Sequence, residues 1–272
     1  HHAPDHSRKF FNFYAIFLAK WLCWLNVPAI TVSYASKRAL EEYTPLRKIK
    51  VIYNGLETSL DNSEMYSFVN KFQISKDKVI IGMIGSIDSH KGHKVIIEAF
   101  RLSNILQKKA HVVFVGSGED ELVHNLRNAA REYKIENLIT FSGFLPGDPL
   151  SIVSGFDVLV MPTIDFEGFG YSMAEAMFAG VPVIASDVGA IPEVIEKGKS
   201  GLLVDPSDVA GWRLNMEKLV ENKALRRQIG ELGMARVIEK FSANNMSQLY
   251  YNFMTDYNSN DKRELHNKKS EI

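Results

Sequence analysis

Hydrophobic residues along the chain gather in short unbroken runs, separated by longer segments with an amphipathic helical pattern. The runs are rich in Val and Ile and do not alternate with polar residues, which is typical of strands covered on both faces. We expect strands at 29–33, 50–53, 79–85, 111–116, 138–143, 157–162, 181–186 and 201–204. Helical patterns lie between them, for example at 94–108, 119–133 and 171–179. This alternation predicts an α/β fold with a doubly wound, Rossmann-like parallel sheet.

The predicted strands divide the chain unequally. Residues 1–56 hold only two of them, which predicts an incomplete second Rossmann-like portion. Residues 57–77 are polar and predict a linker, whereas residues 78–240 hold six strand runs, enough for a complete domain. Residues 259–272 are polar and predict a disordered tail.

Charge and cysteine content narrow the classes of protein that fit this pattern. Lys plus Arg and Asp plus Glu both number 32, so no net charge attracts the chain to nucleic acid or anionic lipid, and an anionic ligand needs a local site. A single cysteine, Cys23, excludes an internal disulfide and favours a reducing, cytoplasmic compartment. The chain begins with His1 instead of Met, from which we expect a piece of a longer protein or a processed chain.

The segment 10–25 is the most hydrophobic stretch, but Lys20 interrupts it, and about 20 uninterrupted apolar residues are needed to span a bilayer. A core helix is the favoured interpretation. The alternative is a helix that lies on the membrane surface, with Trp21 and Trp24 at the interface.

The segment 167–175 (EGFGYSMAE) carries the most informative chemistry, because it follows a strong strand run and begins a helix. Its glycines allow a ligand to approach the backbone, and amides at a helix N-terminus favour an anion such as phosphate. The amides in question belong to Phe169, Gly170, Tyr171 and Ser172.

Two carboxylates, Glu167 and Glu175, flank that anion site. A carboxylate accepts hydrogen bonds from hydroxyl groups, and its two oxygens suit a vicinal diol. The combination indicates a ligand with sugar hydroxyls on both sides of its phosphates, which describes a nucleotide sugar. The simpler alternative makes Glu167 a solvated loop residue and Glu175 a surface acid of the helix.

A second loop, Gly85–His93 (GSIDSHKGH), also lies between a strand run and a helix, and its Lys91 supplies a positive charge for phosphate. The loop lacks the Walker A pattern, and 116–118 (GSG) gives only the first part of a dinucleotide fingerprint. No D-x-D pattern occurs, and 165–167 (DFE) is the nearest approach to one. We therefore expect no metal site and no cofactor.

Together these segments resemble glycosyltransferase family 4, the group 1 transferases of the GT-B fold. The similarity extends from about Val32 to Phe241 and rests on the order and spacing of VSYASKRAL, VIYNGLE, GSIDSHKGH, VGSGED, FSGFLP, EGFGYSMAE, GVPVIASDVGAIPEVI and SGLLVDPSD. It implies that 78–240 is the nucleotide-sugar-binding domain and that 1–56 is the remnant of an N-terminal acceptor domain. Residues 241–258 would form the helix that crosses back onto that domain.

The resemblance also implies individual roles. Glu167 would contact the hydroxyls of the donor sugar, Glu175 the ribose diol, and Lys91 the departing β-phosphate. The candidate catalytic residues are Glu167, Lys91 and His2, the last as the family's histidine near the sugar. The candidate donor-binding residues are Gly85, Ser86, Lys91, Gly116, Phe144, Glu167, Gly168, Phe169, Gly170, Tyr171, Ser172 and Glu175, with the backbone at Phe144 beside the base.

The implied activity is the metal-independent, retaining transfer of a hexose from a UDP- or GDP-linked sugar to a glycan or lipid-linked acceptor. Polysaccharide or glycolipid synthesis is the implied setting, and the aromatic segment 10–25 favours a lipid-linked acceptor and peripheral contact at the cytoplasmic face of the membrane. One residue departs from the family pattern, since Ser86 stands where many members have an Arg that pairs with the Lys. Two alternatives stay open: a nucleotide-sugar 2-epimerase of the same fold, and a non-catalytic nucleotide-sugar-binding protein.

Overall fold

The computed structural model describes residues 21, 24, 28–43, 49–57 and 66–270 of the chain. The chain divides into two compact units, one made of residues 56–242 and the other of residues 1–55 together with 243–272. The predictions for His2 and for most of the hydrophobic segment 10–25 lie outside the described residues.

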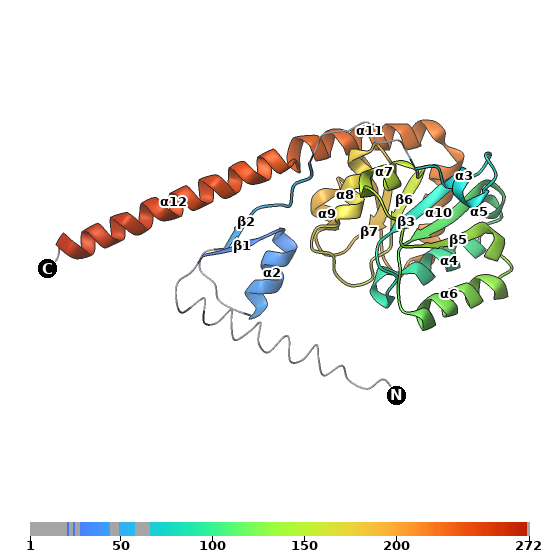
Figure 1. Cartoon of the computed structure of the whole chain (residues 1–272), viewed down its shortest axis with the longest axis horizontal. Helices are drawn as coiled ribbons and strands as arrows, with labels where there is room; N and C mark the ends of the chain where they lie inside the picture. The colour runs from blue at the N-terminus through green and yellow to red at the C-terminus, as the bar shows by residue number, and fades with distance from the viewer. Residues whose placement is uncertain (1–20, 22–23, 25–27, 44–48, 58–65, 271–272) are drawn as a thin grey trace. The chain divides into compact units, whose positions relative to one another are not determined.

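A six-stranded sheet forms the centre of the larger unit (Figure 1). Its strands stand in the order β5-β4-β3-β6-β7-β8, and every neighbouring pair is parallel. The predicted α/β class and parallel sheet are therefore confirmed, and all six strand runs expected within 78–240 form strands. The bounds are β3 Val79–Ile84, β4 Ala110–Val115, β5 Ile139–Gly143, β6 Val158–Met161, β7 Val183–Ser186 and β8 Leu202–Val204.

Helices pack on both sides of this sheet (Figure 1). One group joins α4 (His93–Arg101) to α5 (Asn104–Lys109), α6 (Asp120–Glu132) and α10 (Val209–Glu221). The other joins α8 (Tyr171–Phe178) to α7 (Pro149–Ser154) and α11 (Lys223–Lys240). Shorter elements are α3 (Phe68–Phe72), η1 (Ser89–Lys91), η2 (Glu136–Leu138) and α9 (Ile191–Val194).

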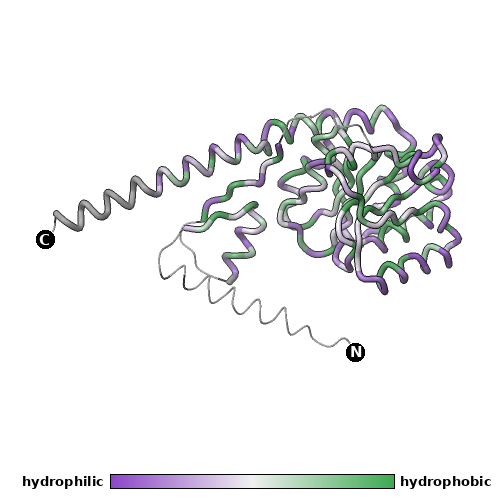
Figure 2. Tube along the Cα trace, viewed as in Figure 1, coloured by the Kyte–Doolittle hydropathy of each residue, from purple (hydrophilic) through white to green (hydrophobic). Residues whose placement is uncertain are grey.

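The core of the larger unit lies between the sheet and the helices that cover it. Phe100, Phe114 and Trp212 are completely buried there, and Figure 2 shows hydrophobic residues gathered in the interior of this unit. Continuous hydrophobic strands are the expected consequence, because a strand with helices on both faces buries every side chain.

Two predicted elements differ from the structure. The helix expected at 94–108 is two helices, because the Ser103 hydroxyl accepts a hydrogen bond from the amide of Leu106 at 3.1 Å and so begins α5 anew. The predicted linker 57–77 contains α3, whose buried Phe68 stacks on Phe156 with ring centroids 4.7 Å apart. The second half of that segment is thus part of the larger unit.

The smaller unit contains β1 (Ala29–Thr31), α2 (Tyr34–Tyr43), β2 (Ile49–Val51) and α12 (Ala243–Ser270). β1 and β2 pair in parallel, as expected for two strands with a helix between them. The expected disorder after residue 258 differs from the structure, which has α12 helical through Ser270. That segment contains no Pro or Gly to interrupt a helix. Among the described helices, none is both long enough and apolar enough to cross a membrane.

Candidate functional site

The candidate site lies where the chain changes direction across the sheet. β3 and β6 are neighbours, although the chain builds β4 and β5 on the far side of β3 before it forms β6. In open parallel sheets ligands bind at the carboxyl ends of two such strands, because the following loops separate there.

The loops after β3 and β6 are held together by their backbones. The amide of Ile164 donates a hydrogen bond to the carbonyl of His90 at 2.8 Å. Gly92 has φ +76°, and a Cβ on it would lie 2.0 Å from the carbonyl oxygen of Pro162. Only glycine fits there, so the sequence Lys91-Gly92 brings the lysine-bearing loop against the loop that carries Glu167.

A pocket of about 430 Å³ opens between these loops. Eight of the residues predicted for donor binding line it, although they come from distant parts of the sequence: Gly85, Ser86, Lys91, Glu167, Gly170, Tyr171, Ser172 and Glu175. Four further residues complete the lining: Met83, Ile84, Pro149 and Met161. The structure therefore brings together both predicted loops and both predicted carboxylates.

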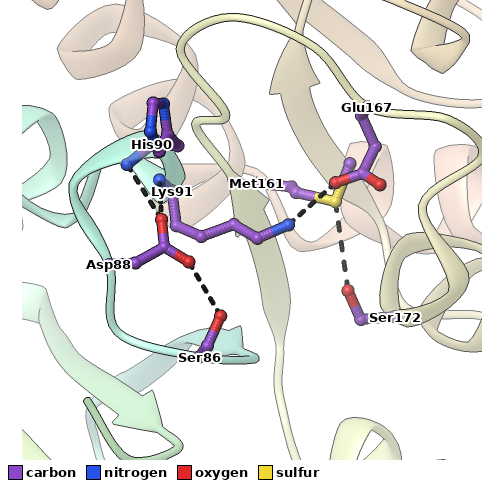
Figure 3. Close-up of polar contacts among 7 residues, drawn as sticks. All are labelled: Ser86, Asp88, His90, Lys91, Met161, Glu167 and Ser172. Carbon is purple, nitrogen blue, oxygen red and sulfur yellow. Dashed lines mark hydrogen bonds and ion pairs between the residues drawn. The ribbon is translucent and has the colours of Figure 1, made fainter. Parts of the chain in front are cut away.

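Lys91 and Glu167 form an ion pair in this pocket. The Lys91 Nζ donates to the Glu167 Oε2 at 2.9 Å, and Figure 3 shows the lysine extended from its loop toward the carboxylate. Lys91 is the only cationic side chain among the described residues of the lining. The ion pair therefore holds the Lys91 ammonium, the one positively charged side chain of the described lining, beside Glu167.

Asp88 organises the loop that carries Lys91. Its Oδ1 accepts hydrogen bonds from the amides of His90 at 2.8 Å and Lys91 at 3.1 Å, and its Oδ2 accepts one from the Ser86 hydroxyl at 2.8 Å (Figure 3). Ser86 is thus an uncharged residue tied to Asp88 at the position where an arginine is expected from the family resemblance.

The N-terminus of α8 forms another wall of the pocket. The N-cap residue is Gly170, with φ +85°, and it offers no side chain to cap the helix. The next residues, Tyr171 and Ser172, line the pocket, so the positive end of the helix dipole faces it. The Ser172 hydroxyl lies 3.9 Å from the Met161 sulfur (Figure 3). A helix end without a side-chain cap is suited to an anion.

Glu175 stands one turn into α8 and is half-buried in the same lining. Burial raises the pKa of this carboxyl above its ordinary value, and the negative charge of Asp148 raises it further. Hydroxyl donors from a ligand would offset the cost of keeping this carboxylate charged.

Four other predicted residues do not line the pocket. Phe169 is buried, with its ring 5.7 Å from that of Phe241. Gly116 supports the site from behind, since a Cβ on it would lie 1.8 Å from the carbonyl oxygen of Gly85. Phe144 is 76% exposed, and Gly168 is likewise absent from the lining. Their roles in donor binding stay predictions, as does that of His2, which lies outside the described residues.

Sequence reasoning missed a hydrogen bond between a histidine and a carboxylate that lies beside the Lys91–Glu167 ion pair. His90 Nδ1 lies 2.7 Å from Asp165 Oδ2, and both side chains are more exposed than Lys91 and Glu167. The available signal was that His90 is next to Lys91 in the sequence and that Asp165 is two residues from Glu167.

Among the described residues, no three His, Cys, Asp or Glu side chains form a group that could hold a metal ion. Metal independence itself stays a prediction.

Comparison with known proteins places these features in a family. Residues 67–236 match the family described as glycosyl transferases group 1. An uncharacterized glycosyltransferase of Methanocaldococcus jannaschii is 29% identical over 80% of this chain and 57% of its own length. The capsular polysaccharide biosynthesis glycosyltransferase CapM of Staphylococcus aureus is 28% identical over 86% of this chain and 62% of its own. This chain thus spans about three fifths of these curated relatives.

Solved structures share the fold. The crystal structure of HepE from Anabaena in complex with UDP and glucose matches with a TM-score of 0.82 and 22% sequence identity. The match covers 93% of this chain and 69% of the HepE chain. At this level of identity the comparison establishes the fold, which agrees with the expected GT-B architecture.

Proposed function

The chain belongs to the group 1 glycosyl transferases, and from this premise we propose that it forms the donor site of a retaining, metal-independent transferase of glycosyltransferase family 4. The observation that carries the proposal is the convergence of Lys91, Glu167, Glu175 and the N-terminus of α8 on one pocket at the carboxyl ends of β3 and β6. Any one of these features occurs in many sites, but the four together suit a nucleoside diphosphate sugar.

The pocket provides a separate partner for each part of such a donor. Its diphosphate would bind at the start of α8 and beside Lys91, which supply a helix dipole and a full positive charge. Glu175 would accept hydrogen bonds from the ribose diol and Glu167 from the sugar hydroxyls. The Lys91–Glu167 ion pair then lies at the junction of phosphate and sugar, where the reacting bond is located.

The reaction breaks the bond between the anomeric carbon and the β-phosphate oxygen. The acceptor oxygen forms the new bond on the same face of the sugar, and the acceptor proton leaves with the phosphate. Negative charge grows on the leaving phosphate during this step, so Lys91 and the α8 dipole stabilise the transition state more than the bound donor.

The setting of the activity is proposed from the relatives. CapM is named for capsular polysaccharide biosynthesis and HepE was solved with UDP, and we propose a UDP- or GDP-linked hexose as donor. The proposed acceptor is a glycan or a lipid-linked glycan, used in cell-surface polysaccharide synthesis at the cytoplasmic face of the membrane, with peripheral membrane contact.

Substitution of Glu167 by Ala tests the assignment of the sugar subsite. Calorimetric titration with UDP, GDP, UDP-glucose and GDP-mannose measures how much the sugar adds to the affinity of its nucleotide. We expect Glu167→Ala to abolish that increment and transfer while it leaves the affinity for free nucleotide within about twofold, since the hydrogen bonds from the donor to Glu167 come from its sugar alone.

Asp165→Ala is the matched control, because Asp165 is a carboxylate two residues away that bonds to His90 and does not line the pocket. Equal loss of nucleotide and nucleotide-sugar affinity in Glu167→Ala would refute its role at the sugar. Addition of a chelator should leave donor binding and turnover unchanged, and strong inhibition would contradict the metal-independent mechanism.

One observation favours the non-catalytic alternative, namely that Ser86 leaves Lys91 as the only cationic side chain among the described lining residues. Release of nucleoside diphosphate only when an acceptor is present would support the transferase. Tight donor binding without any release would support the binding protein, and release of an isomerised sugar without acceptor would support the epimerase.

A further inference from the structure

A third segment contacts the backbone of Glu167 without lining the pocket. This segment is the turn 187–190, which connects β7 to α9 and is called the β7–α9 turn below. The amide of Ala190 donates a hydrogen bond to the carbonyl of Glu167 at 2.8 Å, and Ala190 is completely buried. The backbone on which the Glu167 side chain stands is therefore bonded to a neighbouring loop.

Gly189 brings the turn close enough for that hydrogen bond. Its φ is +55°, in the left-handed region that favours glycine. A Cβ at this position would lie 2.4 Å from the carbonyl oxygen and 2.6 Å from the nitrogen of Glu167. The nearest atoms to this hypothetical Cβ all belong to the backbone of Glu167, so no flexible side chain exists there that could move aside.

The loop that bears Glu167 is held at several points, and the contact with Ala190 is one of them. At its start, the Ile164 amide bonds to the loop of His90, and Pro162 packs against Gly92. Between that point and Glu167, Asp165 is bonded to His90, whereas the side chains of Ile164 and Phe166 are 41% and 51% exposed. The contact with the β7–α9 turn is thus a fixed point beside an exposed stretch, and it lies at the residue whose carboxylate pairs with Lys91.

We infer that Gly189 is a positioning residue for Glu167: it lets the β7–α9 turn fix the Glu167 backbone, so that the carboxylate faces Lys91 and the donor sugar. This inference rests on the proposed function, since it takes Glu167 as the contact to the sugar. It adds that the sugar subsite depends on a turn that follows the neighbouring strand β7. The nucleotide subsite at the start of α8 should be independent of Gly189, because the atoms nearest to a Cβ at Gly189 all belong to Glu167.

The substitution Gly189→Ala tests this. The new Cβ must move from 2.4 Å to an ordinary contact distance of about 3.4 Å or more, which displaces Glu167 by about 1 Å, and a misplacement of that size costs on the order of 100-fold in rate. We expect transfer to fall by about 10- to 100-fold and the affinity increment from the sugar to disappear. The affinity for free UDP or GDP should stay within about twofold.

Gly198→Ala is the matched control. Gly198 also has a positive φ, of +77°, but a Cβ there would meet nothing within 4 Å. Both variants therefore carry similar backbone strain, and only one of them moves Glu167. Melting temperatures identify any general loss of stability, and we expect Gly198→Ala to keep the nucleotide-sugar increment and the rate of the wild type.

A double-mutant cycle separates positioning from general damage. If Gly189 acts through Glu167, Gly189→Ala should reduce nucleotide-sugar affinity strongly in the wild type and by less than about twofold in Glu167→Ala. Equal losses in both backgrounds, or parallel loss of free UDP and GDP affinity, would overturn the inference. Retention of the sugar increment in Gly189→Ala would overturn it as well.

The same titrations distinguish failure of this inference from failure of the proposed function. If the wild-type protein binds UDP-glucose and GDP-mannose no more tightly than the free nucleotides, Glu167 has no sugar to contact, and the proposed function fails first. If the wild type shows the increment and Glu167→Ala removes it while Gly189→Ala does not, the proposed function stands and only the positioning role is refuted.

Discussion

Lys91→Ala separates the stability contributed by the Lys91–Glu167 ion pair from its contribution to the reaction. The lysine and carboxylate side chains are 32% and 19% exposed, and partly exposed pairs of this kind contribute at most about 1 kcal/mol to the free energy of unfolding. Chemical denaturation should therefore show a change of that size or less. The melting temperature should fall by no more than a few degrees.

The effect on turnover should be larger. A hydrogen bond from a charged group contributes about 1.5–3 kcal/mol, and the charge on the leaving phosphate is greatest in the transition state. Since each 1.36 kcal/mol is a factor of ten in rate, Lys91→Ala should slow release of the nucleoside diphosphate by about 10- to 150-fold. Donor affinity should fall less, because the ground-state diphosphate also bonds to the start of α8.

The assay is the steady-state release of UDP or GDP from the donor in the presence of a glycan acceptor, with calorimetric titration for affinity. Lys109→Ala is the control, because Lys109 forms a similar ion pair with Glu221 at 2.8 Å on the surface. An unchanged rate in Lys91→Ala would remove Lys91 from the mechanism. A loss of kcat/KM that equals the loss of donor affinity, with kcat unchanged, would mean that Lys91 binds the donor without stabilising the transition state any further.

Three further predictions concern charge and protonation. Glu175→Gln should raise the free energy of unfolding at pH 7, because burial raises the pKa of Glu175 and makes its ionised form costly, and this gain should vanish as the pH falls below the ordinary pKa of 4.5. Nucleotide affinity should drop about 10-fold or more, and a variant without either change would refute the role of Glu175 at the ribose diol. Ser86→Arg should tighten nucleotide binding about fivefold by adding a second positive charge, unless the neighbouring Asp88 captures it, in which case calorimetry will show no gain. Burial lowers the pKa of His93 and of His111 to about 4, so these histidines stay neutral in the folded protein while the unfolded chain takes up protons as the pH falls from 6.5 toward 4. Denaturant titrations should therefore give a lower free energy of unfolding at pH 5 than at pH 7, by about 1–2 kcal/mol for each histidine. A variant with His111 replaced by Gln should lose about half of the total difference.

The strands of the larger unit could be predicted from sequence because burial on both faces leaves a direct signature. The run at 157–162 contains no charged residue after Asp157, and it becomes β6, which is buried throughout. Helix ends were less predictable. The break at Ser103 depends on a single hydroxyl that bonds the amide of Leu106, and the hydrophobic pattern continues through it.

The chemistry of the pocket could be predicted in part for a similar reason. Two short segments carry the pattern. After β3 come glycines and a lysine, and after β6 come glycines between two carboxylates, so each segment indicates its own ligand chemistry without knowledge of the rest of the fold. The role of the Phe144 backbone beside the base stays a prediction, because the pattern FSGFLP carries no information on where this backbone lies or which direction its ring faces. In the structure that ring is exposed and outside the pocket lining.

By itself, the sequence determined which residues carry charge, which runs are buried and which turns need glycine. Only the tertiary structure decided that Lys91 and Glu167, 76 residues apart, meet at 2.9 Å, because that distance follows from β3 and β6 being neighbours in the sheet. It also decided that Gly189 lies against the Glu167 backbone. Close approach between distant segments depends on how strands pair and loops cross, and no local pattern of side chains encodes that geometry.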